Sequence, residues 1–424
     1  MKKHLKTVPA FITLLAALVT PGQLYAQDNL EDGHSHPRYS LKVLGTLGNP
    51  FDSEGHGLNN RGSVAGQSFL PNGALHAFFW QKGVMTDLGT LGGPDSFVNV
   101  ANHTVNEKNV VAGYSETSTP DPNAENFCNP FFANGLVCLA FAWENGVMTA
   151  LPTLGGTNGQ AWGINNRGQI VGQAEGPDPA PCSPFALQVS AVVWRNGQIE
   201  QVLPPFGGSA AIATAINDNG EVVGLSGCNT GTFYAVLWRH DNPINLGTLG
   251  GVFGNVPFDI NNKGQVVGQS DLLGDTVHHG FLWENGRMTD VGSLPGLPTS
   301  IAQAINDQGQ VVGFSQDANG DDSSSVAFLW QNGVLRDLNT LIPAGSQLFL
   351  MEATAINDRG QIAGFGQLPD GEHLGFLLTP CNEDSVFHND CSYDTAAVGS
   401  SAYGSTPKLS STDSRLSGWR VARY

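Results

Sequence analysis

The chain has 424 residues, a formal net charge of −18 and only 13% charged residues. Because a strongly acidic chain repels phosphate backbones, we do not expect nucleic acid as a partner. The 54 glycines and the short apolar segments between them are typical of an all-β protein with many turns.

The first 26 residues have the features of an export signal. An apolar stretch at Val8–Val19, too short to span a bilayer, follows three lysines: Lys2, Lys3 and Lys6. Cleavage near Ala26 would take the formal charge from −18 to −21. We therefore expect a secreted or periplasmic protein with a mobile segment over 27–37 and no membrane span; a retained anchor is the alternative.

Three short motifs then recur seven times over about residues 38–380. The first is an alternating segment followed by a tight turn, the asparagine turn, which begins at Asn59, Asn106, Asn165, Asn217, Asn261, Asn306 and Asn357. The second is an aromatic segment that ends at Trp80 in the first copy, and the third is a glycine-containing segment such as Leu88–Gly93. Repeats of about 45–50 residues indicate a stacked or circular array.

The copy around Asn217 predicts four antiparallel strands. Ala211–Ile216 alternates small and larger residues, and Asn217–Gly220 suits a tight turn because Asn, Asp and Gly tolerate positive φ. The other three strands follow in order: Glu221–Leu225, Tyr234–Trp238 and one that opens at Asn242–Leu246. Four such strands make one propeller blade.

The two ends of the array are complementary. Tyr39–Leu47 is a fourth strand without its first three, and Leu374–Leu378 is a third strand without its fourth. Their pairing would remove exposed sheet edges. We therefore predict an all-β fold: a seven-bladed β-propeller of four-stranded antiparallel blades over 38–380, closed by an N-terminal strand that completes the last blade. An open solenoid is the alternative.

Antiparallel connectivity assigns the loops to two faces. The asparagine turns and the Asn-Gly turns lie on one face, the asparagine-turn face, and their uniformity indicates scaffold. The links between second and third strands and between blades lie on the variable face, and they include Ser115–Val137, Ala174–Gln188, Ser226–Thr232 and Ser315–Ser325. Variable loops on a rigid frame usually carry binding.

All six cysteines lie beyond the signal, and an even number in an exported protein suggests disulfides. Cys128–Cys138 and Cys381–Cys391 are each close in sequence, so Cys182–Cys228 would pair by elimination; sequence alone does not prove this connectivity. Cys182 and Cys228 occupy the same link of adjacent blades. The repeat ends near Cys381, and we expect 381–424 to be a serine-rich tail with a small disulfide loop.

One polar loop is a candidate calcium site. Oxygen-bearing side chains surround Gly320 as in calcium loops, without the closing bidentate glutamate: Asp317, Asn319, Asp321 and Asp322. Calcium is the only cofactor that the sequence suggests. A solvated polar loop is the alternative.

A second candidate site lies near the predicted axis. His56 and His103 each stand three residues before an asparagine turn, Glu54 precedes His56 by two residues, and Glu352 holds the position of Glu54 in the seventh blade. These side chains could bind metal or act as acid and base. The same position holds unrelated residues elsewhere, so a hydrogen-bonded core histidine is the alternative: Trp162, Thr214, Phe258, Gln303 and Thr354.

The motifs resemble those of the bacterial extracellular HAF-repeat family. His76–Phe78 with Trp80 and then Asp87–Gly93 matches the HAF pattern, and Gly264–Gly268 and Gly309–Gly313 fit its G-Q-V-V-G strand. Several copies depart from the pattern, among them Leu139–Trp143 and Ser190–Trp194, which lack the leading histidine. The resemblance implies export and a repeat fold and leaves the function open, because the family has no established catalytic residues.

We expect a monomeric binding module that takes an extracellular glycan, peptide or surface protein through the variable face. One alternative is an extracellular polysaccharide lyase or glycosidase with a site near the axis. The inner strands contain very few Arg or Lys to neutralise a substrate carboxylate, which favours a non-enzyme. A structural surface or biofilm component is a further alternative, since a propeller fold does not choose among these.

Overall fold

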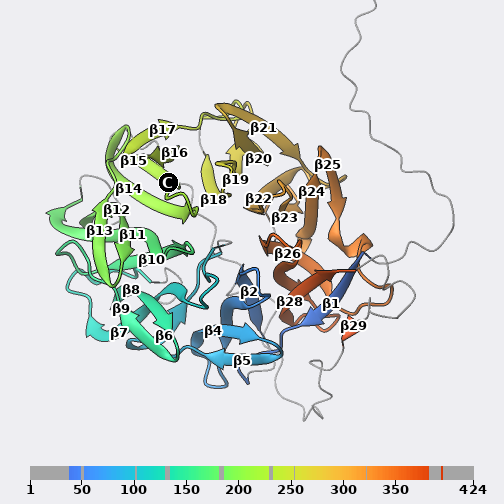
Figure 1. Cartoon of the computed structure of the whole chain (residues 1–424), viewed down its shortest axis with the longest axis horizontal. Coiled ribbons are helices and arrows are strands. Elements are labelled where there is room, and N and C mark those ends of the chain that lie inside the picture. The colour runs from blue at the N-terminus through green and yellow to red at the C-terminus, as the bar shows by residue number, and fades with distance from the viewer. Residues whose placement is uncertain are drawn as a thin grey trace, which may run out of the picture. The chain divides into compact units, whose positions relative to one another are not determined.

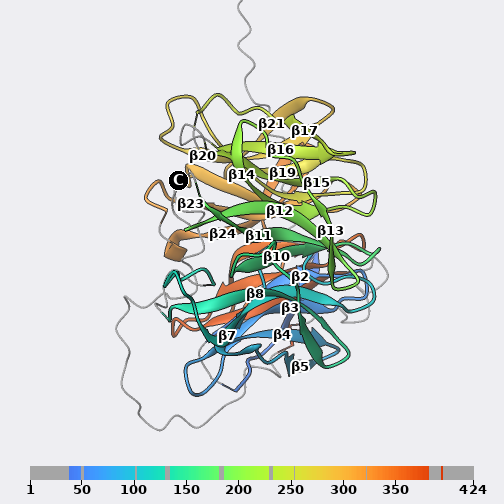
Figure 2. The same ribbon diagram turned by 90° about the vertical axis from the view of Figure 1, so that its left-hand side faces the viewer.

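The computed structural model describes residues 38–48, 52–100, 103–128, 134–180, 186–228, 233–252, 254–320, 322–381 and 393–394. They form seven antiparallel sheets arranged around a central axis (Figure 1). The view turned by 90° shows neighbouring blades stacked on one another around the ring (Figure 2). The predicted seven-bladed β-propeller is confirmed. The expected export signal, the segment 27–37 and most of the expected tail lie outside the described residues.

The strands of each blade are hydrogen-bonded in chain order. Blades 1 to 3 are β2 (Ser53–Leu58), β3 (Val64–Phe69), β4 (Leu75–Gln81) and β5 (Val84–Asp87); β6 (Gly92–Phe97), β7 (Val111–Pro120), β8 (Leu136–Glu144) and β9 (Val147–Ala150); and β10 (Gly159–Ile164), β11 (Gln169–Pro179), β12 (Leu187–Arg195) and β13 (Gln198–Val202). Blades 4 and 5 are β14 (Gly208–Ile216), β15 (Val222–Cys228), β16 (Phe233–Arg239) and β17 (Asn242–Asn245); and β18 (Val256–Ile260), β19 (Val266–Asp271), β20 (His278–Glu284) and β21 (Arg287–Gly292). Blade 6 is β22 (Thr299–Ile305), β23 (Val311–Gln316), β24 (Val326–Gln331) and β25 (Val334–Asp337), with the 3-10 turns η1 (Asp322–Ser324) and η2 (Leu338–Thr340) beside it.

Blade 7 joins the two ends of the ring. It consists of β26 (Phe349–Ile356), β27 (Ile362–Gln367), β28 (His373–Pro380) and β1 (Tyr39–Val43), which pairs antiparallel with β28 from Tyr39 opposite Pro380 to Val43 opposite Phe376. Closure by the N-terminal strand is therefore confirmed. A short strand from the tail, β29 (Tyr393–Asp394), adds to β1 in parallel, which the sequence did not predict.

The hydrophobic core lies between adjacent blades. Phe79 of blade 1 and Trp143 of blade 2, for example, belong to one buried cluster, with ring centroids 5.7 Å apart. The indole N–H of Trp194 and that of Trp238 each donate to a proline carbonyl at the end of the preceding blade, 2.8 Å away in both cases. The recurring tryptophans therefore fasten one blade to the next.

Six of the seven inner strands contain a β-bulge three residues before the asparagine turn. The bulged residues are His56, Trp162, Thr214, Phe258, Gln303 and Thr354. In blade 2 the inner strand has five residues, 99–103, at the place where blade 1 has only His56. The strand pairing before and after this place, which is equivalent in the two blades, defines the comparison. His103 is thus the last of these five residues, and the residue of blade 2 that corresponds to Glu54 is Phe97.

Candidate functional site

The asparagine turns form a closed ring of hydrogen bonds. In blade 4, Oδ1 of Asn217 accepts the backbone N–H of Asn219 (3.0 Å) and of Glu221 (2.9 Å), while its Nδ2 donates to the carbonyl of Asn261 in the next blade (3.0 Å). All seven asparagines make the corresponding bond to the next blade, and Asn357 donates to the carbonyl of Asn59. This ring explains why the motif recurs.

A second ring is formed by the residues that follow these asparagines. Each side chain accepts the backbone N–H of its counterpart in the preceding blade, at 2.6–2.9 Å: Asn60, Glu107, Asn166, Asp218, Asn262, Asp307 and Asp358. Together the two rings line an axial funnel of about 110 Å³ on the asparagine-turn face. Four carboxylates make its lining acidic.

Two residues that depart from the repeat pattern, His103 and Asp259, meet at this funnel. His103, which lines the funnel and is 35% exposed, approaches the fully buried Asp259 with its Nδ1 2.9 Å from Oδ1. The two carboxylate oxygens of Asp259 also accept the backbone N–H groups of Ile260 (2.8 Å) and Ile305 (2.9 Å). Asp259 is therefore held firmly enough to fix the orientation of the imidazole.

The electrostatics of this pair favour a protonated imidazole. Burial lowers the pKa of His103, but the charge and hydrogen bond of Asp259, with further contributions from Asp218 and Asp358, outweigh burial and raise it above its ordinary value. A histidine held by a carboxylate can serve as a base or a hydrogen-bonding partner. The funnel lining contains no Ser, Thr, Cys, Lys or Arg, so the side chains in the described part of the funnel that could act as nucleophiles are its carboxylates.

The other predicted axial residues do not join His103. His56 is fully buried, and its ring nitrogens lie 2.7 Å from the carbonyl oxygen of Val98 and 3.0 Å from Oε2 of Glu54. Glu352 has the blade 7 position that corresponds to Glu54. The described residues contain no group of three His, Cys, Asp or Glu side chains that could hold one metal ion. His56 thus lies in a hydrogen-bonded core environment.

The predicted calcium loop is only partly described. Oδ1 of Asp317 accepts the backbone N–H of Asn319 at 3.0 Å, so this carboxylate caps its own turn. Asp322 begins the short turn η1, and Asp321 lies outside the described residues.

The motif histidines pair with motif aspartates at the blade exterior. His76 lies 2.8 Å from Asp87, and His279 lies 2.9 Å from Asp290. For His76, burial lowers the pKa, but Asp87 outweighs it; for His279, the hydrogen bond from Asp290 is the largest effect, and both pKa values are raised. In blades 1 and 5, the histidine of the second motif thus contacts the aspartate of the third motif, across the third and fourth strands.

On the variable face, the hairpins of blades 2 and 3 are longer than the others. Their second strands have 10 and 11 residues, compared with 6 or 7 in the other blades. We call the ends of these hairpins, residues 116–128, 134–138, 173–180 and 186–188, with the adjoining 156–160, the blade 2–3 platform. The predicted Cys128–Cys138 disulfide is present in it, with a Cα–Cα distance of 5.1 Å.

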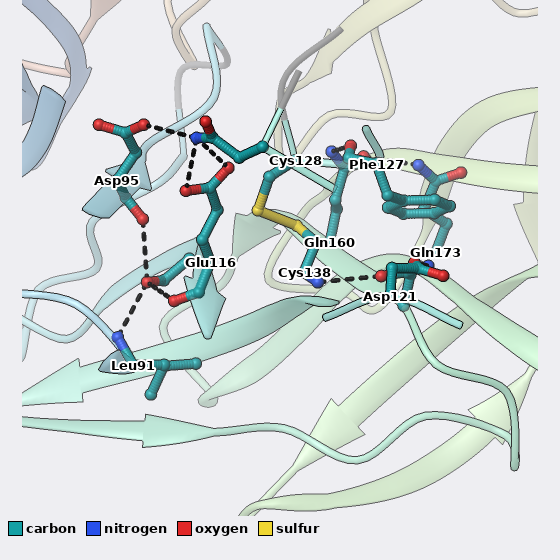
Figure 3. Close-up of a disulfide and its surroundings, with 12 residues drawn as sticks. Leu91, Asp95, Glu116, Asp121, Phe127, Cys128, Cys138, Gln160 and Gln173 are labelled. Carbon is teal, nitrogen blue, oxygen red and sulfur yellow. Dashed lines mark hydrogen bonds between the residues drawn. A yellow bond between two sulfur atoms is a disulfide. The ribbon is translucent and has the colours of Figure 1, made fainter. Parts of the chain in front are cut away.

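Hydrogen bonds between the two blades hold the platform together. Nε2 of Gln160 donates to the carbonyl of Phe127 (2.8 Å), and the backbone N–H of Cys138 donates to Oδ1 of Asn158 (2.9 Å). The backbone N–H of Ala186 donates to Oε1 of Glu125 (2.6 Å). Figure 3 shows the disulfide with the carboxylates of Asp95 and Glu116 on one side and the amides of Gln160 and Gln173 on the other.

The remaining cysteines are only partly described. Cys381 is disulfide-bonded, and its predicted partner Cys391 lies outside the described residues, as does Cys182, the predicted partner of Cys228.

Sequence reasoning missed Asp259 and the acidic groups of the platform. Asp259 stands two residues before its asparagine turn, where the other copies have small residues: Gly57, Thr104, Gly163, Ala215, Ala304 and Ala355. A charged residue at a small-residue position was the available signal.

No helix in the described parts of the chain is long and apolar enough to cross a membrane.

Known proteins show only a distant likeness to this chain. No protein-family model and no curated protein sequence matches the chain. Among solved structures, the chain is similar to an acylaminoacyl peptidase of Pyrococcus horikoshii, with 12% identity over 72% of this chain and a TM-score of 0.42; it spans about half of that protein (48%). It is also similar to a putative TolB of Agrobacterium tumefaciens (11% identity, 82% of this chain and 100% of that one, TM-score 0.38) and to a gluconolactonase of Xanthomonas campestris (11%, 81% and 90%, TM-score 0.39). Likeness at this level is no argument for a shared activity.

Proposed function

We propose that this chain is a secreted binding module of the HAF-repeat type, which recognises an extracellular glycan, peptide or surface protein through the blade 2–3 platform. The observation that carries the proposal is the pair of lengthened hairpins, which a disulfide and bonds between blades hold in place. Loops fixed before binding lose less conformational entropy on binding. A disulfide in such a loop suits an exported protein.

The test compares variants on the two faces. The secreted chain is applied to arrays of glycans and of extracellular proteins, and each binder is then measured by biolayer interferometry. Thr119→Lys and Asp178→Lys change exposed positions of the platform, and we expect each to weaken binding at least tenfold. The matched control, Lys108→Glu, changes an exposed position on the asparagine-turn face and should leave binding unchanged. Loss of binding in the control alone would contradict the proposal.

The His103–Asp259 pair favours a second candidate, an enzyme that uses the funnel. Here His103, oriented by Asp259, would act as an acid or base toward a bound ligand, and a funnel carboxylate or a water molecule would be the nucleophile. His103→Ala should then abolish turnover of any arrayed polysaccharide, while Thr119→Lys should not. Turnover that survives in His103→Ala would exclude the funnel as the catalytic site.

A further inference from the structure

The blade 2–3 platform buries carboxylates that have no cationic partner. Glu175 is fully buried, Asp121 nearly so, and Glu125 partly. None of the three forms an ion pair with Lys, Arg or His among the residues that the structure describes. An ionised carboxylate without such a partner is unfavourable in a protein interior. Something else must therefore compensate this charge.

Two buried side-chain oxygen atoms on β11 lack a hydrogen-bond donor. Oε2 of Glu175 accepts bonds from Thr157 and from the backbone N–H of Asn158 (2.8 Å), whereas its Oε1 has no partner. Oε1 of Gln173 also has none, although Nε2 of this side chain donates to Gln160 (2.6 Å). Residues two apart in a strand point to the same face, so Gln173 and Glu175 present both unsatisfied oxygens to one side of β11.

Two further carboxylates lie close to this part of blade 3. Nδ2 of Asn158 lies 2.6 Å from Oδ2 of Asp121 and 3.5 Å from Oε2 of Glu125, which brings both acidic side chains of the blade 2 segment to the edge of blade 3. Burial, and then the charge of Glu125, raise the pKa of Glu175 to about 7. Either a proton or a hard cation could therefore neutralise the cluster.

We propose that a calcium ion binds between blades 2 and 3, with Oε1 of Glu175 and Oε1 of Gln173 as protein ligands and with Asp121 and Glu125 as neighbouring charges. Calcium accepts six to eight oxygen ligands in irregular geometry, and water can supply those that a protein does not. A proton on Glu175 would neutralise only one of the three carboxylates, whereas a calcium ion carries two positive charges that balance two of them. Such an ion would fasten the 121–128 segment to blade 3. The proposal is independent of what the platform recognises.

The test measures calcium binding directly at pH 8, where a carboxyl group with a pKa of about 7 is mostly ionised. Native mass spectrometry of the EDTA-treated secreted chain should show one added ion with CaCl2, and calorimetry should give a Kd on the order of 10⁻⁴–10⁻³ M, as in extracellular modules. Glu175→Gln should weaken binding at least tenfold, and Gln173→Met should weaken it if Glu175→Gln does not fold. Glu144→Gln, an exposed glutamate of blade 2, is the control and should bind as the parent does.

Three results would overturn the proposal. The first is the absence of any bound calcium at pH 8, with a melting temperature that rises only as the pH falls below about 7; a proton alone would then neutralise Glu175. The second is calcium binding that survives both Glu175→Gln and Gln173→Met. The third is binding that Asp317→Asn removes, because the ion would then belong to the blade 6 loop.

Discussion

The two faces of the ring join neighbouring blades by opposite means. On the asparagine-turn face, one amide bond is made seven times, once by the side chain of each turn asparagine. On the variable face, blades 2 and 3 are joined by several unlike bonds, among them those of Asp121 and Glu125, and Glu175 is buried beside them with one unsatisfied oxygen. The first arrangement is neutral and repeated, which suits a scaffold. The second is unfavourable for folding and is found in two blades, which suits a function.

The largest expected effect is on the repeated face. Asn217→Ala removes four hydrogen bonds and leaves the backbone N–H groups of Asn219 and Glu221 without their acceptor, so we expect a loss of about 3–5 kcal/mol in the free energy of unfolding. Urea denaturation followed by tryptophan fluorescence measures it. Asn261→Ala, one blade away, should cost the same within about 1 kcal/mol. Unequal costs would mean that the seven turns do not contribute equally to the ring.

The next effect is the pH dependence of the variable face. In calcium-free buffer the pKa of Glu175 is raised, to about 7, so the protonated form is favoured in the folded protein. Its contribution to stability is complete below pH 4.5, the ordinary value, and is lost as the pH rises through about 7. The loss amounts to at most about 3 kcal/mol. Glu175→Gln should flatten the curve of unfolding free energy against pH. An unchanged curve would assign the pH dependence to another group, such as Asp52 beside blade 1, because burial raises the pKa of this carboxyl to about 7 as well.

The disulfide should have a smaller and more local effect. Cys128→Ala with Cys138→Ala opens a short loop, and the chain-entropy estimate for such a loop is about 2–3 kcal/mol. We expect faster proteolysis within 116–138 while the urea transition of the ring is retained. Cleavage spread evenly over all seven blades would show that the platform is part of the scaffold.

The smallest effect tests whether repetition alone implies stability. The His76–Asp87 pair recurs as His279–Asp290, but the aspartates are 39% and 43% exposed. Exposed ion pairs contribute little, so His76→Ala should cost less than about 1 kcal/mol by urea denaturation at pH 6. A cost as large as that of Asn217→Ala would mean that the burial of a motif does not determine how much the motif contributes to stability.

The architecture followed from the sequence because its signals are local. Asn217–Gly220 must turn and Tyr234–Trp238 must pack, and the corresponding segments follow in the same order in every copy, so the blades could be counted before their contacts were known. The complementary ends at Tyr39 and Leu378 are the same kind of signal. Each such prediction rests on residues within one blade.

The candidate sites depend on contacts between distant segments, which no local pattern contains. His103 has the same offset from its asparagine as His56, so the sequence made the two equivalent, yet the extra residues before His103 bring it to Asp259, 156 positions away. Glu175 and Asp121 meet through Asn158 in the same manner. Their neighbours could not be known until the blades were in place.

The pairing of β1 with β28 has a consequence for how the protein is made. Ser40 pairs with Thr379, 339 residues later, and a ribosome needs about 20–70 s to cover that distance at common elongation rates. During this time one of the first strands to emerge has no partner, and six blades can assemble around a gap. The ring cannot lock until its last strand arrives, so a nascent chain stopped before residue 373 would present two open edges to other chains. Completion of synthesis, rather than the stability of any single blade, therefore decides whether the chain forms a closed ring or an incomplete one whose open edges favour aggregation.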